Sequence, residues 1–151
     1  MTRPFRPTKR GIRVSLAPAE RAILRQLPGL LDSVGDPSDD PAAARLRPSA
    51  YPDDPDAEDE FRRLMAGELD EARGADRAGF LEDLAGPAVL DEERAGAWLR
   101  VLDESRLVLA ARLGIEEDGW EESMPGSDPE VTLLHYLGWL QEELIEALGE
   151  P

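Results

Sequence analysis

Arg106 is the residue of this 151-residue chain whose type and position most strongly suggest chemistry. It interrupts an apolar seam with helical spacing that is formed by Leu99, Leu102, Leu109 and Leu113. A buried charge without a partner is costly, so the guanidinium should hold a carboxylate, and Asp103 and Glu142 are the candidates. Three interpretations stay open: an ion pair that fixes helix register, a site for a small anion, or exposure beside a narrower seam.

Other residue types that carry chemistry are scarce. The chain has no cysteine, which excludes disulfides and thiol catalysis, and His135 is its single histidine. A metal centre needs more nitrogen or sulfur ligands than that, and nothing near His135 indicates a catalytic triad. An acidic run at 53–60 lacks the glycine and the terminal glutamate of an EF-hand loop. We therefore expect no catalytic residues, no metal and no cofactor, and predict that the chain is not an enzyme.

Charge is unevenly distributed. The net charge is −16, yet residues 1–13 contain no acidic residue and five basic ones: Arg3, Arg6, Lys9, Arg10 and Arg13. The remaining 138 residues hold 12 basic and 33 acidic side chains, a net charge of −21. This basic arm is a candidate contact for DNA or for a protein partner. The alternatives are a solvated tail or a contact with the chain's own acidic body.

Three aromatic residues are candidate anchors for a protein partner. Tyr136 and Trp139 fall near the apolar seam of a predicted helix, where core packing is the competing interpretation. Trp120 lies in an acidic loop and can belong either to the core or to an interface.

The elements that must position these residues are mainly helical. Two long helices are predicted around 98–115 and 131–148; the first begins at Asp91 as its N-cap and ends at Gly114, and the second opens at 127–130. A helix from Pro18 to Val34 should be interrupted at Pro28. A helix from about Asp54 and a separate short one over 76–84 follow a loop at 35–57.

The first residues predict a short β-hairpin of 5–6 against 12–16, and 88–90 can add a further strand. We thus predict a mainly α, single-domain bundle of about five helices. Residues 1–16 would form the basic arm with its β element, and 17–151 the acidic helical domain. The longest uncharged stretch near the C-terminus, 131–141, is too short to span a bilayer, and the first residues do not resemble a signal peptide, so a cytoplasmic location is expected.

Several segments together carry a family resemblance. They are Leu-Arg-Pro at 46–48 with Tyr-Pro-Asp-Asp-Pro at 51–55, Phe-Arg-Arg-Leu at 61–64, Trp-Leu-Arg at 98–100, Ser-Arg-Leu at 105–107, Arg-Leu-Gly-Ile at 112–115 and Leu-Gly-Trp-Leu-Gln-Glu at 137–142. The chain resembles an actinobacterial family long filed as a domain of unknown function, which includes AosR-type oxidative-stress regulators. The family's genes commonly lie near a ClpS-type protease adaptor and a cysteine-biosynthesis cluster.

The resemblance implies a cytoplasmic, non-enzymatic transcriptional regulator that contacts the transcription machinery or another regulator, with DNA contact by the basic arm. The alternative is a protein-interaction module or adaptor linked to regulated proteolysis, without DNA binding. Thiol-based sensing cannot operate in a chain without cysteine, and the sequence at 103–106, Asp-Glu-Ser-Arg, is more acidic than the resemblance leads us to expect. The two long helices can meet within one chain or form a homodimer seam.

Overall fold

The computed structural model describes residues 3–35, 40–46, 50–114 and 129–150. These residues form six helices and one small sheet, which confirms the mainly α prediction. The elements are β1 (Phe5–Thr8), β2 (Gly11–Val14), α1 (Pro18–Leu24), α2 (Leu27–Asp32), α3 (Pro41–Leu46), α4 (Pro55–Leu84), β3 (Val89–Leu90), α5 (Glu92–Arg112) and α6 (Pro129–Gly149). None of the described helices is long and apolar enough to cross a membrane.

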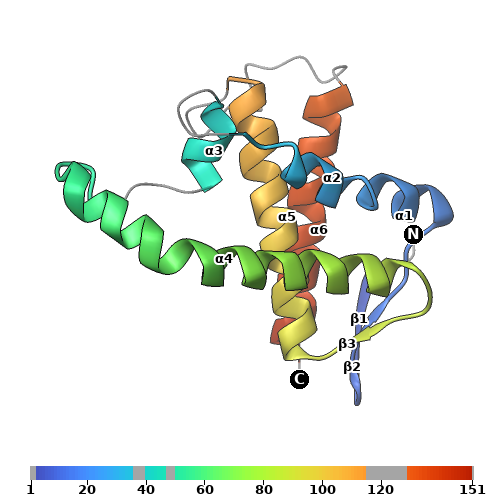
Figure 1. Cartoon of the computed structure of the whole chain (residues 1–151). Helices are drawn as coiled ribbons and strands as arrows, with labels where there is room; N and C mark the ends of the chain where they lie inside the picture. The colour runs from blue at the N-terminus through green and yellow to red at the C-terminus, as the bar shows by residue number, and fades with distance from the viewer. Residues whose placement is uncertain (1–2, 36–39, 47–49, 115–128, 151) are drawn as a thin grey trace.

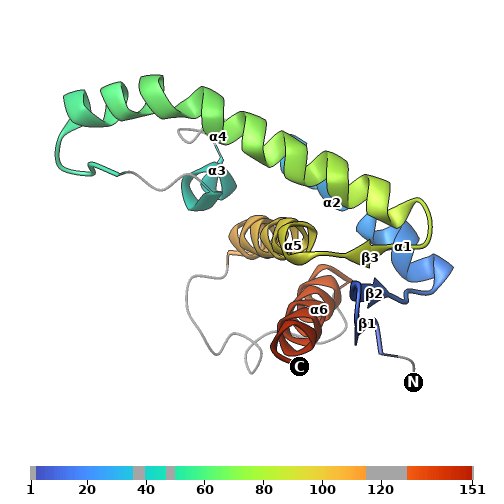
Figure 2. The same ribbon diagram turned by 90° about the horizontal axis from the view of Figure 1, so that it is seen from below.

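Helices α5 and α6 lie side by side at the centre of the fold, within one chain (Figures 1 and 2). The Asp91 side chain caps α5 as predicted, because its Oδ1 accepts the Arg94 N–H at 2.8 Å. The chain leaves α5 through Gly114, whose φ of 75° is the left-handed conformation that commonly ends a helix. Residues 127 and 128, which the sequence placed at the start of the last helix, lie outside the described residues.

Helix α4 runs across α5 and extends beyond the rest of the body at its N-terminal end (Figures 1 and 2). The Asp54 carboxylate accepts the Ala57 N–H at 3.2 Å, so the helix begins where expected. Two separate helices were predicted here, and that was wrong: α4 continues through Gly74. Ion pairs just beyond this glycine hold the helix against its neighbour, including Arg100 with Asp76 at 2.7 Å and Arg77 with Glu104 at 3.5 Å.

The sheet has the strand order β1-β2-β3, and both pairings are antiparallel. The predicted hairpin is present, and the third strand at Val89–Leu90 pairs Leu90 with Ile12. Alternation along the hairpin buries Phe5, Ile12 and Val14 against the helices. The basic residues of β1 and β2, Arg6 and Arg13, are opposite one another in the register and exposed.

Two short helices precede α4. The chain breaks between α1 and α2, with Pro28 in the first turn of α2, as the proline predicted. The prediction that 35–57 is only a loop was wrong, because α3 forms at its centre and packs on α5. Ala42, Ala43 and Leu46 are buried there, so tertiary burial stabilises a six-residue helix that local propensity leaves marginal.

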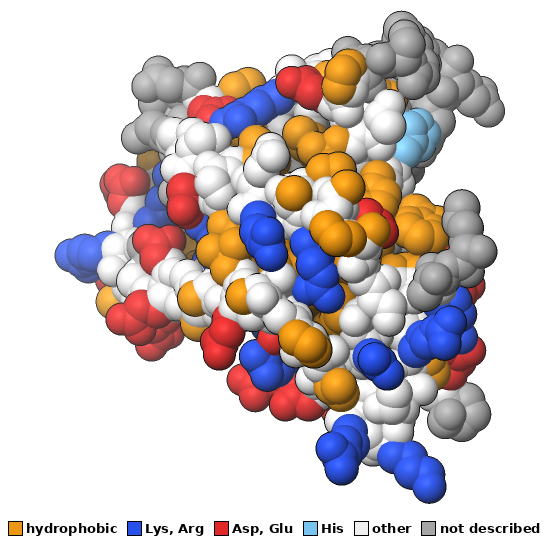
Figure 3. Space-filling model, turned by 90° about the vertical axis from the view of Figure 1, so that its right-hand side faces the viewer, with side chains coloured by type: hydrophobic (Ala, Val, Ile, Leu, Met, Phe, Trp, Pro, Cys, Tyr) orange, Lys and Arg blue, Asp and Glu red, His pale blue; other side chains and the backbone are white. Residues whose placement is uncertain are grey.

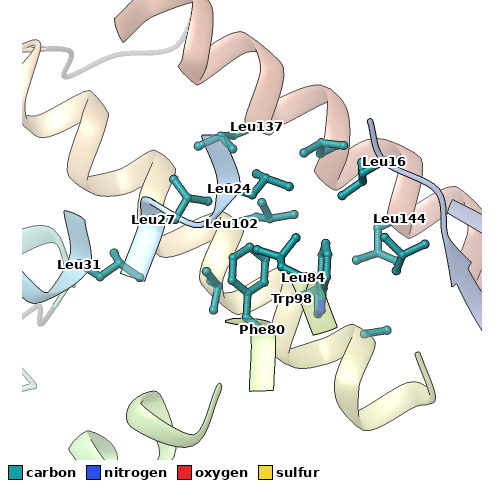
Figure 4. Close-up of a cluster of buried hydrophobic side chains, with 14 of the residues drawn as sticks. Leu16, Leu24, Leu27, Leu31, Phe80, Leu84, Trp98, Leu102, Leu137 and Leu144 are labelled. Atoms are coloured by element: carbon teal, nitrogen blue, oxygen red, sulfur yellow. The ribbon is translucent and has the colours of Figure 1, made fainter. Parts of the chain in front are cut away.

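Trp98 of α5 occupies the centre of the core, where α4, α5 and the sheet meet (Figure 4). Its ring contacts Phe5 and Phe80 edge-on, with centroid separations of 5.8 Å and 4.6 Å. Its Nε1 donates to Asp83 Oδ2 at 3.0 Å, and the same carboxylate pairs with Arg94 at 2.5 Å. Asp83 is therefore a buried charge with both a hydrogen-bond donor and a cation in place.

Replacing Asp83 with alanine is expected to lower the free energy of unfolding by about 2 kcal/mol, because the buried Trp98 N–H loses its acceptor. Asp83→Asn keeps an acceptor for that N–H and should cost less. Urea unfolding followed by circular dichroism would measure both, with Asp70→Ala on the exposed part of α4 as the matched control. Equal losses for Asp83→Ala and Asp83→Asn would contradict the role given to the Trp98 bond.

Candidate binding face

Tyr136 and Trp139 lie next to each other on α6, with ring centroids 6.0 Å apart. Trp139 is 40% exposed, and Tyr136 is partly buried. The Tyr136 hydroxyl donates to Glu20 Oε2 at 2.5 Å, while Glu20 Oε1 accepts the Ala17 N–H at the start of α1. Glu20 thus joins α1 to α6. Burial, followed by the hydrogen bond to Glu20, raises the pKa of Tyr136, so its phenol stays protonated and remains a donor.

These aromatic rings border an open hollow of about 800 Å³, which we call the aromatic groove. Its lining comes from the residue that precedes β1, the connection between β2 and α1, the first half of α1 and the middle of α6. The lining residues are Pro4, Ser15, Leu16, Ala17, Glu20, Arg21, Tyr136 and Trp139. An open apolar hollow with an exposed tryptophan at its border is the kind of surface on which protein partners place a hydrophobic side chain.

A second open hollow, of about 680 Å³, lies beside the hairpin, and we call it the cationic groove. Of the described residues, four arginines and no acidic residue line it. The lining residues are Thr8, Arg10, Arg13, Val14, Ser15, Arg21, Arg25 and the segment 84–89. Figure 3 views the face that carries α1 and the hairpin, with basic side chains from its centre to its lower edge and hydrophobic side chains above them.

Arg21 and Arg25 are held in this groove by backbone carbonyls at the end of α4. Arg21 donates to Leu84 O at 3.0 Å and to Gly86 O at 3.3 Å, and Arg25 donates to Leu84 O at 3.2 Å. The last carbonyls of a helix carry partial negative charge, which guanidinium groups stabilise. Neither residue was predicted as a functional residue from the sequence. Their i, i+4 spacing in a predicted helix was the available signal, because it places both on one face.

The basic arm predicted from the sequence is largely a folded hairpin. Arg6, Lys9, Arg10 and Arg13 are exposed on it, and Arg10 and Arg13 reach the cationic groove. Arg3 differs from the other four, because it pairs with Glu150 at 2.7 Å. Among the described ion pairs, Arg3 is the member of the arm whose contact matches the alternative of a charge-balancing interaction with the acidic body.

Most basic side chains elsewhere in the described residues are paired with carboxylates. Those in ion pairs are Arg3, Arg62, Arg63, Arg73, Arg77, Arg94, Arg100 and Arg112. By contrast, the four arginines of the cationic groove form no ion pair with any described carboxylate, in a chain that contains 33 acidic residues. The groove therefore presents positive charge that no carboxylate in the described part of the chain neutralises.

Arg106 does not make the expected ion pair with Asp103 or Glu142 within the described part of the chain. Its Nη1 donates to Oε1 of the neutral Gln141 side chain at 2.6 Å. Its guanidinium lies over Gly138, where an added Cβ would be 3.5 Å from Cζ. Asp103 and Glu142 are both exposed, since each is rotated out of the α5–α6 interface. Gln141 precedes Glu142 by one position, or about 100° of helix rotation.

Two other residues were singled out from the sequence. His135 lies exposed on α6, and Trp120 lies outside the described residues. Among the described residues no cluster of three or more histidine, cysteine, aspartate or glutamate side chains could hold a metal ion.

Comparison with known proteins places the chain in a family. No curated protein and no solved structure is significantly similar to this chain. A family model described as a domain of unknown function, DUF2017, matches residues 2–148, which include both grooves and the whole of the core. The chain therefore belongs to the DUF2017 family.

Proposed function

We propose that this chain is a non-enzymatic cytoplasmic regulator of the AosR type, which acts by binding a protein of the transcription machinery or another regulator. One observation carries the proposal: Trp139 is 40% exposed at the border of an open apolar groove. Aromatic residues are enriched in protein interfaces, where a few well-packed anchors supply most of the binding energy. The resemblance of several sequence segments to oxidative-stress regulators gives the regulatory context.

The hydrogen bonds of Glu20 support the proposal, because they hold the border of the groove in place. Glu20 bonds to Tyr136 and to the first turn of α1, so the two helices that border the groove are fixed relative to each other. Leu16, which lines the groove, is also part of the hydrophobic core. A partner would therefore meet a preformed surface, which reduces the entropy cost of association.

The test is a chromosomal Trp139→Ala substitution, with transcripts compared before and after peroxide exposure. We expect the substituted strain to match a deletion strain while the protein's abundance stays at the wild-type level. Ile145→Ala is the matched control, because Ile145 is 56% exposed on the same helix and does not border the groove. Its transcripts should match those of the wild type.

Two outcomes contradict the proposal. Transcripts that are unchanged both by Trp139→Ala and by deletion of the gene would exclude a regulator. A change in the stability of particular proteins, with their transcripts unchanged, would favour the adaptor linked to regulated proteolysis.

A further inference from the structure

We infer that the aromatic and cationic grooves form one recognition surface for a protein segment in which apolar residues are followed by a run of acidic residues. The inference rests on the proposed function, because it specifies the chemistry of the partner that such a regulator would bind. Its structural basis is that the two grooves are adjacent and share Ser15 and Arg21.

Continuity of the surface is the first step. Arg21 lines both grooves. Its Nε donates to Leu16 O at 3.4 Å, and its Nη1 donates to the carbonyls of Leu84 and Gly86 at the end of α4. An extended segment that places an apolar side chain beside Trp139 would therefore continue past Arg21 toward Arg25 and the hairpin. Among the described residues that line the aromatic groove, the acidic one is Glu20, and it is already bonded to Tyr136.

The charge of the second groove is the next step. Arg10, Arg13, Arg21 and Arg25 have no ion-pair partner among the described carboxylates, although the chain as a whole is strongly acidic. Arg21 and Arg25 are oriented by backbone carbonyls, which leave guanidinium N–H groups free for a ligand. A guanidinium fixed in this way binds carboxylates with little further loss of side-chain freedom.

An acidic peptide fits these features better than a nucleic acid does. A duplex presents phosphates over a long surface, but this groove offers four arginines on a chain with a net charge of −16. The adjoining aromatic groove is lined largely by apolar groups, which give a phosphate backbone no partner. A peptide with an apolar anchor and neighbouring carboxylates would use both halves at once.

The first experiment measures the anisotropy of a fluorescently labelled short peptide that carries a Leu-Phe pair followed by consecutive glutamates. The full chain should bind it, and added salt should weaken binding because the carboxylate–arginine contacts are screened. Replacing the glutamates with glutamine, or Leu-Phe with Ser-Ser, should weaken binding at least about fivefold in each case. Labelled duplex and single-stranded DNA of similar length are the comparison probes.

The second experiment changes the protein. Arg10→Gln with Arg13→Gln should weaken peptide binding about tenfold, since both side chains are exposed and neither has an ion-pair partner among the described residues. Arg62→Gln with Arg63→Gln is the matched control. It removes the same number of positive charges from an exposed part of α4 that lines neither groove. It should leave the affinity for the peptide unchanged.

Several results would overturn the inference: no binding of the Leu-Phe peptide at low salt, equal binding of its glutamine version, an equal loss in the two double variants, or tighter binding of DNA than of the peptide. Failure here is distinguishable from failure of the proposed function. If the peptide does not bind but Trp139→Ala still abolishes regulation, the partner's chemistry is wrong and the regulatory role stands.

Discussion

Replacing Trp98 with alanine should lower the free energy of unfolding by about 4 kcal/mol, the largest loss expected from any single truncation in the core. Trp98 is fully buried, and its ring contacts Phe5 of β1 and Phe80 of α4. Truncation leaves a cavity where these elements meet and leaves the Asp83 carboxylate without its indole donor. Urea unfolding monitored by far-ultraviolet circular dichroism would measure the loss.

Trp139→Ala is the matched control for this measurement, because it removes the same side chain from an exposed position on α6. We expect a loss of less than about 1 kcal/mol there. If Trp98→Ala cost no more than Trp139→Ala, the assignment of Trp98 to the centre of the core would be contradicted.

Gly11→Ala should destabilise the protein by about 3 kcal/mol, although it adds a single methyl group. Gly11 has a φ of 137°, a conformation that residues with a side chain rarely adopt. An added Cβ would lie 2.3 Å from the carbonyl oxygen of Leu90, which belongs to the backbone of β3. The β2–β3 pairing must therefore open to admit it. Thermal unfolding would report the change as a lower Tm.

Gly74→Ala is the control for Gly11→Ala and should have the opposite sign. Gly74 lies inside α4, is exposed, and has nothing within 4 Å of an added Cβ. Alanine should stabilise this helix by about 0.5–1 kcal/mol. A loss of stability at Gly74 as large as the one at Gly11 would mean that the positive φ of Gly11 and its close approach to Leu90 are not the cause.

Helix periodicity and end signals were enough to predict much of the fold. The long helices α5 and α6 were found from their apolar spacing, and Asp91 and Gly114 marked the ends of α5 correctly. The hairpin and the third strand were also found. The continuity of α4 was missed for two reasons. Gly74 lowers helix propensity locally. The ion pairs of Asp76 and Arg77, which hold the helix against α5, are tertiary contacts that local sequence does not reveal.

The binding face was predictable only in part. Tyr136, Trp139 and the basic hairpin residues were selected from the sequence, but their assembly into two adjoining grooves depends on how α1 and α6 meet. Arg21 and Arg25 were missed because their guanidinium groups are held against the end of α4 by hydrogen bonds between residues about 60 positions apart in the sequence. The predicted carboxylate partner of Arg106 differs from the observed one, which is Gln141. Neighbouring positions on a helix differ in direction by about 100°, so the rotation of α6 decides whether Gln141 or Glu142 faces Arg106.

Inward and outward positions alternate along the hairpin, so packing constrains one set of residues and surface charge depends on the other. Phe5 and Ile12 face inward and belong to the core, whereas Arg6 and Arg13 face outward from neighbouring positions. Deleting the hairpin would remove charge and core together, so truncation cannot isolate the role of the charge, but substitution at the outward positions can. The same separation lets the charge of this face diverge among related proteins while the inward positions, and with them the fold, stay constant.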